Sequence, residues 1–178
     1  QTAQREALAH FQAGTKNMSA TMASAPSSEQ TLLGGLGRAL VQHRVLRPDQ
    51  AVQIQKHAND NHVPFIDELI DSKHLSPRDL ARFAAESFGH PMFDLSGLDP
   101  AAIDLGLLDR KLAVEARVLP LGKRGNRLSV AISDPTDYQT LDRIKFSAQA
   151  TVDPIVVEHD KLVRLIERAT RGTADQLS

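Results

Sequence analysis

The sequence predicts an α+β protein in which a duplicated helix–turn–helix bundle precedes a small αβ sandwich with a mixed sheet. Two observations lead to this prediction. Residues 31–90 carry apolar side chains at the spacing of amphipathic helices, and a similar pattern occurs twice, 29 residues apart. Residues 91–170 instead contain a hairpin pattern and alternating strands between helical stretches. The 178 residues are enough for two small units of this kind.

The two helical copies correspond position by position. Leu75 precedes Ser76, a suitable helix N-cap, and Pro77 follows as a suitable first helical residue. One copy alone cannot bury its apolar face, so we expect the two copies to pack together. The matching apolar pairs are Leu36 with Phe65, Leu40 with Leu69, Val41 with Ile70, Leu46 with Leu75, and Ile54 with Phe83.

The second half is expected to place its helices on one face of the sheet. Residues 118–121 and 127–133 are predicted to form a hairpin, and a short strand is predicted over 92–95. Pro154 favours an edge position for the last strand. Two helical stretches are expected over residues 99–108 and 109–118, with Asp99 and Asp109 as caps. A further helix after Pro135 is expected to turn Leu141, Ile144 and Phe146 inward.

The two ends of the chain are expected to lie outside this core. Residues 1–30 are predicted to be a flexible lead-in, because residues 18–30 are rich in Ser and Ala and poor in core-forming side chains. Met18 has the character of a natural start, and on that interpretation residues 1–17 are an addition to the natural protein. Residues 171–178 are expected to fray.

Composition excludes several classes of function. Apolar residues make up 41% and charged residues 24% of the chain, as in an ordinary globular protein. A net charge of -1 provides no general attraction to nucleic acid or acidic membranes. The absence of cysteine excludes disulfides, thiolate metal sites and cysteine nucleophiles. No apolar run in the sequence approaches the roughly 20 residues that cross a bilayer.

No motif in the chain predicts catalysis or a metal site. The pair Gly122-Lys123 lies in a hairpin turn and lacks the flanking residues of a P-loop. The glycines of residues 34–37 precede a helix, but no strand precedes them, which excludes a dinucleotide fingerprint. The seven histidines are scattered without a repeated ligand spacing.

Two polar segments have alternative interpretations. Ser133–Pro135 ends a strand and is interpreted as a helix N-cap, with a ligand loop as the alternative. Lys123, Arg124 and Arg127 gather on the predicted hairpin, where they form either a solvated turn or a docking point for an acidic partner.

Three stretches carry a resemblance to one family: ARFAAESFGHPMFDLSGLD, VLPLGKRGNRLSVAISDP and VEHDKLVRLIERA. Over about residues 32–170 the chain resembles the N-terminal domain of the GspE-type secretion and pilus ATPases, nearest to the PilB-like assembly ATPases of type IV pili. The resemblance implies a fragment without enzymatic activity, because the family's motor with its Walker motifs would follow residue 178.

The resemblance also implies partners. It predicts a cytoplasmic domain, peripheral to the inner membrane and without a transmembrane segment, that couples a hexameric ATPase motor to the inner-membrane pilus platform or to regulatory proteins. Nucleic acid is not an expected partner. The equivalent domain of a type II secretion ATPase is an alternative assignment with the same fold.

A second alternative is a cyclic di-GMP sensor. Some members of the family bind this dinucleotide through 24-residue tandem motifs, which here would span residues 35–58 and begin again at Pro64. The candidate ligand-binding face comprises Leu36, Gly37, Leu40, Val41, Leu46, Gln50, Phe65, Leu69 and Leu75.

The chain departs from the motif where the ligand chemistry would lie. Motif glycines would let the backbone approach the guanines, and motif arginines would pair with base edges or phosphate. We therefore expect a docking role first and dinucleotide binding second. Arginine positions hold Gly35 and Pro64, and glycine positions hold Arg44, Ile66 and Lys73.

Overall fold

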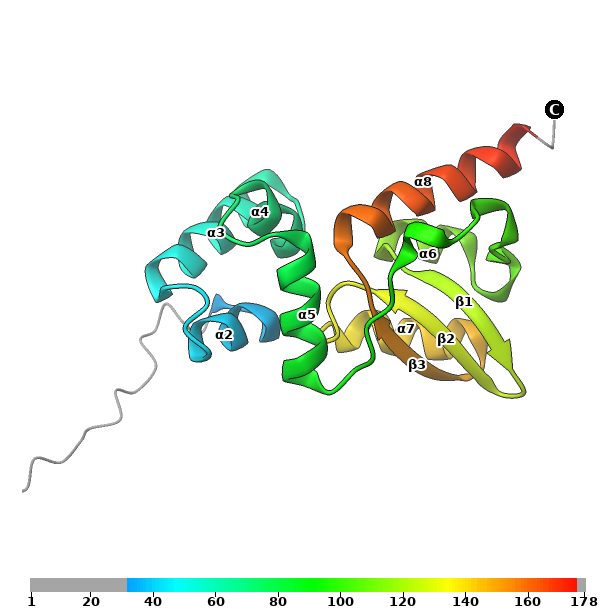
Figure 1. The fold of residues 1–178 in the computed structure, drawn as a ribbon, viewed down its shortest axis with the longest axis horizontal. Helices are drawn as coiled ribbons and strands as arrows, with labels where there is room; N and C mark the ends of the chain where they lie inside the picture. Colours follow the sequence, from blue (N-terminus) through cyan, green and yellow to red (C-terminus); the bar gives the residue numbers. More distant parts are fainter. Residues whose placement is uncertain (1–31, 176–178) are drawn as a thin grey trace, which may run out of the picture.

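The computed structural model describes residues 32–175, without the side chains of residues 172–175. The predicted lead-in over residues 1–30 therefore lies outside the described residues. Figure 1 shows two halves joined along the chain, a helical half and an αβ half. The helical half contains α2 (Gly35–Gln42), α3 (Pro48–Asn61), α4 (Phe65–Asp71) and α5 (Pro77–Phe88).

The duplication seen in the sequence is also present in the backbone. α3 and α5 both begin at a proline of the matching motif, and Ser76 Oγ accepts a 3.1 Å hydrogen bond from the Asp79 N–H, as predicted for an N-cap. Arg44 and Lys73 occupy the same position in the two copies, and both adopt left-handed φ values of 59° and 57°. The two copies therefore share their turn geometry as well as their apolar pattern.

The core of the helical half extends to the sheet. Leu36, Leu40, Leu69 and Leu80 are completely buried, and the same cluster includes Val156 of the sheet. α5 lies between the other three helices and the αβ half, as Figure 1 shows. Small side chains along the buried side of α5 permit this close packing on two sides.

The αβ half begins with three 3₁₀ turns, η2 (Leu95–Gly97), η3 (Pro100–Ala102) and η4 (Leu105–Leu107). The remaining elements are α6 (Arg110–Ala116), β1 (Leu119–Arg124), β2 (Arg127–Ile132), α7 (Tyr138–Ala148), β3 (Thr151–Val156) and α8 (His159–Asp175). The sheet order is β1-β2-β3, with β1 antiparallel and β3 parallel to β2. The α+β class, the hairpin, the mixed sheet and the edge position of Pro154 are thus confirmed.

The expectation that helices cover only one face of the sheet was wrong. Leu128, Val130 and Ile132 pack with Leu141 and Ile144 of α7 on one face. On the other face, a second buried cluster joins the sheet to α8 and the 3₁₀ turns. The strands carry apolar residues at successive positions, which point to opposite faces, so both faces of the sheet are apolar and both are covered. The second cluster comprises Leu95, Leu119, Ala131, Val157, Leu162, Leu165 and Ile166.

Two predicted elements before the hairpin were also wrong. Residues 92–95 contribute only an isolated bridge between Met92 and Val156 rather than a strand. The expected helix over residues 99–108 is replaced by 3₁₀ turns, because Asp94, Asp99 and Asp104 each accept a backbone N–H two residues later. Such local side-chain hydrogen bonds favour turns over continued helix.

Two details of the later helices differ from expectation. Phe146 is 88% exposed rather than inward, because it lies on the side of α7 opposite the buried Leu141 and Ile144. Helix α8 continues to Asp175, beyond residue 170, where the tail was expected to begin.

Candidate functional site

The nine residues of the predicted ligand-binding face lie together, but most of them form the core between the two helical copies. Leu36, Leu40, Leu46 and Leu69 are buried, as is Gly37. Partly buried side chains pack against this cluster, namely Val41, Phe65 and Leu75. The duplicated positions therefore join one copy to the other through apolar contacts.

Gly37 and Phe65 show how closely the two copies approach. A Cβ atom on residue 37 would lie 3.4 Å from Cζ of Phe65, so a larger side chain there would push against the ring. Gln50, the one polar member of the predicted face, accepts a 3.1 Å hydrogen bond from the backbone N–H of Arg47. That bond stabilises the first turn of α3.

A cleft of about 220 Å³ lies between the helical half and the αβ half. It is bounded by the start of α4, the end of α6, the loop after β2 and the first turns of α7. Phe65 of the predicted face lines this cleft. The charged and polar side chains around it are Glu115, Arg117, Ser133, Asp134, Asp137, Thr140, Arg143 and His159.

A partly buried polar network crosses the junction of the two halves. Nε2 of His159 lies 2.5 Å from Oδ1 of Asp67, and Nδ1 of His159 lies 2.8 Å from Oγ of Ser133. The guanidinium of Arg117 donates to both oxygens of Asp67. These four side chains come from α4, the turn after α6, the end of β2 and the first turn of α8.

The geometry assigns a consistent proton arrangement to the network. A neutral His159 carrying its proton on Nε2 donates to Asp67, and its Nδ1 accepts the hydroxyl proton of Ser133. Burial lowers the pKa of His159 and outweighs the opposing effect of the Asp67 carboxylate; the Arg117 charge adds to the lowering. Burial raises the pKa of Asp67, but hydrogen bonds from Arg117 and His159 hold it below the ordinary value.

The order Ser133–His159–Asp67 has the composition of a hydrolase triad, but its setting is structural. Ser133 and His159 are only 8% and 6% exposed. The ring is also turned the other way from a catalytic triad, because Ser133 contacts Nδ1 and Asp67 contacts Nε2, whereas in a triad the serine contacts Nε2 and the aspartate Nδ1. The network's evident effect is to join the two halves, since its members come from both.

Sequence analysis did not identify this network. Ser133 was interpreted as a helix N-cap, yet α7 begins at Tyr138 and is capped by Asp137, whose side chain accepts from the Thr140 N–H. The loop between them is folded by Asp134, which accepts from the backbone N–H and hydroxyl of Thr136. No spacing in the sequence connects Ser133 with residues 67, 117 and 159, so pattern alone offered no signal.

The loop after β2 also sets the position of α2. A Cβ atom on residue 35 would lie 2.8 Å from Cβ of Thr136. The glycine at position 35, where the tandem motif has arginine, thus lets the helical half rest on the αβ half.

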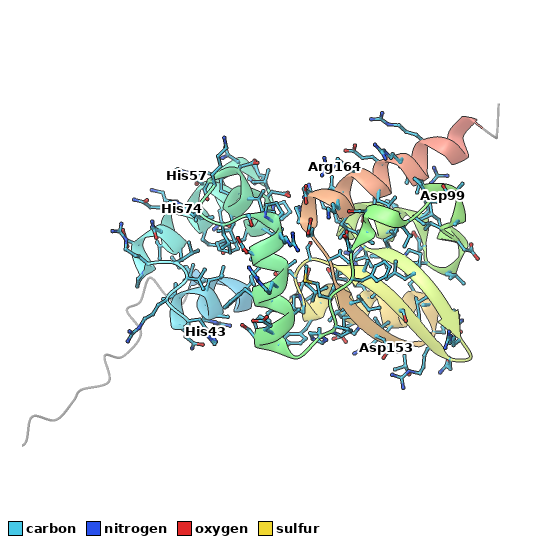
Figure 2. All side chains as sticks on the ribbon, in the orientation of Figure 1. His43, His57, His74, Asp99, Asp153 and Arg164 are labelled. Atoms are coloured by element: carbon cyan, nitrogen blue, oxygen red, sulfur yellow. The ribbon has the colours of Figure 1, made fainter. Side chains whose placement is uncertain are left out.

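Two further findings concern possible metal ligands and helix length in the described part of the chain. No group of three or more His, Asp or Glu side chains within residues 32–175 is arranged to hold a metal ion. Figure 2 shows His43 in a different part of the helical half from His57 and His74. Across the same residues, every helix falls short of the length and apolarity needed to cross a membrane.

Comparison with known proteins assigns the chain to a family. The MshEN domain model matches residues 88–176. The chain is similar to the type IV pilus assembly ATPase PilB of Pseudomonas aeruginosa, with 38% identity over 146 residues, which cover 82% of this chain and 26% of that protein. PilB of Acinetobacter baylyi is 40% identical over 117 residues, 66% of this chain and 20% of that protein. The chain thus matches about a quarter or less of the length of these relatives.

Two solved structures share the fold. A structure of MshE with cdg matches with a TM-score of 0.55 and 26% identity, covering 75% of this chain and 97% of that one. The N-terminal domain of XpsE matches with a TM-score of 0.59 and 23% identity, covering 81% of this chain and 97% of that one. The XpsE match supports the fold alone.

Proposed function

Because the chain belongs to the MshEN domain family, we propose that it is a non-catalytic N-terminal docking and regulatory module of a type IV pilus assembly ATPase. It would act in the cytoplasm at the inner membrane, coupling the hexameric motor to the pilus platform or to regulatory proteins. The similarity to PilB over 82% of this chain is the observation that carries the proposal. The equivalent module of a type II secretion ATPase is the alternative, and it would have the same fold.

The polar junction supports a docking role. Arg117, Ser133 and His159 of the αβ half hold Asp67 of the helical half in a connected network. A module of this kind presents its surfaces in a defined relative position, which transmission between a motor and a partner requires.

A retention assay tests the proposal directly. The purified chain is immobilised and exposed to the purified platform protein of its own pilus system, and separately to that system's regulators. Retention of either supports a docking module, and retention of the corresponding secretion-system platform would reassign the partner. Retention of none of these proteins would overturn the proposal.

Cyclic di-GMP binding is the second candidate function. The structural match to MshE with cdg, at 26% identity, favours it. Arg44 and Lys73 argue against it, because their side chains stand where the motif glycines would let the backbone approach the guanines. Gly35 and Pro64 argue against it, because neither supplies the motif's guanidinium.

Calorimetry with the purified chain and cyclic di-GMP separates the two candidates. Heat that saturates at ligand concentrations up to about 100 μM would establish a sensor. An absence of heat over that range, with the platform or a regulator still retained, would leave docking as the function.

A further inference from the structure

One face of the sheet is only partly covered. Beneath α8 this face buries Leu119 and Ala131, but toward the β1–β2 hairpin it opens into a groove of about 550 Å³. The floor of the groove is apolar and includes Leu121, Ile155 and Phe93. Phe93 is 43% exposed. Exposed apolar side chains beside a concave surface are typical of a binding site.

The rim of the same groove is positively charged. Lys123, Arg124 and Arg127 line it, and the strand register places Arg124 directly opposite Arg127. Like charges in such a cross-strand pair destabilise a hairpin. Nearby anionic groups would relieve this repulsion.

One carboxylate of the chain neutralises part of this positive charge. Asp153 accepts from Nε and Nη2 of Arg127 at 2.9 and 2.7 Å, and Figure 2 shows it at the edge of the sheet near the hairpin. Among the ion pairs formed by the side chains of residues 32–171, none involves Lys123 or Arg124. The rim therefore has a local surplus of positive charge on a chain whose net charge is -1.

We propose that this surface, the hairpin groove, binds an acidic peptide segment of a partner protein. One or two apolar side chains of the segment would cover Phe93, Leu121 and Ile155, while its carboxylates would pair with Arg124, and Lys123 would add positive charge from the adjoining position of β1. Arginine suits this role because its guanidinium can bind a carboxylate through two hydrogen bonds. The inference rests on the proposed docking function and specifies the chemistry of one partner.

The shape of the groove favours a peptide over other anions. A bilayer surface would require the apolar groups to project beyond the cations, whereas here they form the floor of a concavity. A nucleic acid would require a more extended positive surface than three cations, one of which is already paired.

Nuclear magnetic resonance with a defined probe tests the inference. The ¹⁵N-labelled chain is titrated with a synthetic peptide of alternating Glu and Leu, and separately with a peptide of alternating Lys and Leu. The acidic peptide should shift the resonances of Gly122 and Ser129 and should bind at least tenfold more tightly than the basic one. The double variant Lys123→Glu/Arg124→Glu should lose at least tenfold in affinity.

A matched variant controls for net charge. Arg38→Glu/Lys56→Glu reverses two exposed cations on α2 and α3, far from the groove in sequence and on the other half. It should bind the acidic peptide as the unchanged chain does. The spectra themselves report whether each variant is folded.

Several outcomes would overturn the inference. They are equal affinity of the Lys123/Arg124 variant and the unchanged chain, resonance shifts confined to the helical half, and binding to phosphatidylglycerol vesicles without binding to the acidic peptide. Platform or regulator retention without acidic-peptide binding would refute the groove alone. Peptide binding without retention of any platform or regulator would refute the proposed docking function alone.

Discussion

Gly35 lies against Thr136 so closely that a Cβ atom added to the glycine would stand 2.8 Å from the threonine Cβ. The contact joins the first turn of α2 to the loop after β2, and so joins two parts of the chain 101 residues apart in sequence. It complements the polar junction of Asp67, Arg117, Ser133 and His159, which connects the same two halves.

Replacing this glycine tests the close approach. Gly35→Ala should lower the free energy of unfolding by about 1–2 kcal/mol, because overpacking outweighs the better helix propensity of alanine. Urea denaturation measures the change. The control is Gly34→Ser, since a Cβ on residue 34 meets nothing within 4 Å and serine is a good N-cap. Rescue of Gly35→Ala by Thr136→Gly is expected, and a simple sum of the two losses would contradict the contact.

Removing the charge of Asp67 should weaken the junction. In Asp67→Asn, Arg117 loses its carboxylate partner and His159 loses a charged acceptor, so we expect a loss of about 1–3 kcal/mol in unfolding free energy. Asp71→Asn is the matched control at an exposed position of the same helix and should change stability by less than about 0.5 kcal/mol. Equal effects of the two variants would show that the network contributes nothing.

Stability should fall as the solution becomes acidic. The pKa of His159 lies below its ordinary value of 6.5. As the pH falls below 6.5, this histidine therefore becomes protonated in the unfolded chain before it does so in the folded chain. The contribution of neutral His159 to the free energy of unfolding is therefore complete above about pH 6.5. It is lost as the pH falls from there towards the lowered pKa of His159 in the folded state. The pKa of Asp67 is also lowered, so a second loss begins as the pH falls below its ordinary value of 3.8.

Urea denaturation between pH 7.5 and pH 5.5 isolates the histidine contribution. His159→Gln should flatten the pH dependence, because glutamine does not titrate. His74→Gln, at an exposed position in the turn before α5, is the matched control for removal of an imidazole. An unchanged slope in His159→Gln would assign the acid sensitivity to another group.

The left-handed residues of the two copies should respond alike to glycine. Arg44→Gly and Lys73→Gly should each raise the unfolding free energy by about 0.5–1 kcal/mol, because glycine adopts a positive φ without steric cost. Arg38→Gly, within α2, should instead lose about 1 kcal/mol. Destabilisation at residues 44 and 73 would mean that their side chains contribute contacts worth more than the backbone strain.

Local patterns predicted most of the fold because they depend on neighbours in the chain. The cap at Ser76, the two proline-started helices and the hairpin around Gly125 all follow from interactions within a few residues. The predictions failed where two local signals competed. The aspartates at 94, 99 and 104 favoured turns over helix, and Phe146 carries an apolar side chain at a position that the helical period directs to solvent.

For the hairpin groove, the sequence identified the cationic side chains but not the apolar residues that lie beside them. It placed Lys123, Arg124 and Arg127 together because they are neighbours on one hairpin. It could not indicate that Phe93 and Ile155 form an apolar floor beside them. The nine positions of the dinucleotide motif followed from the resemblance to a family, yet their burial depends on how the two copies pack.

The order of residues alone was enough to establish a duplicated helical unit and a mixed αβ half, because periodicity and turn chemistry are short-range properties. The resemblance to a family came from three stretches of the sequence. Three features arise only when distant segments of the chain meet. They are the contact of Asp67 with His159, the contact of Gly35 with Thr136 and the hairpin groove. Their energies depend on distance and burial in three dimensions, and neither quantity is encoded in any local pattern.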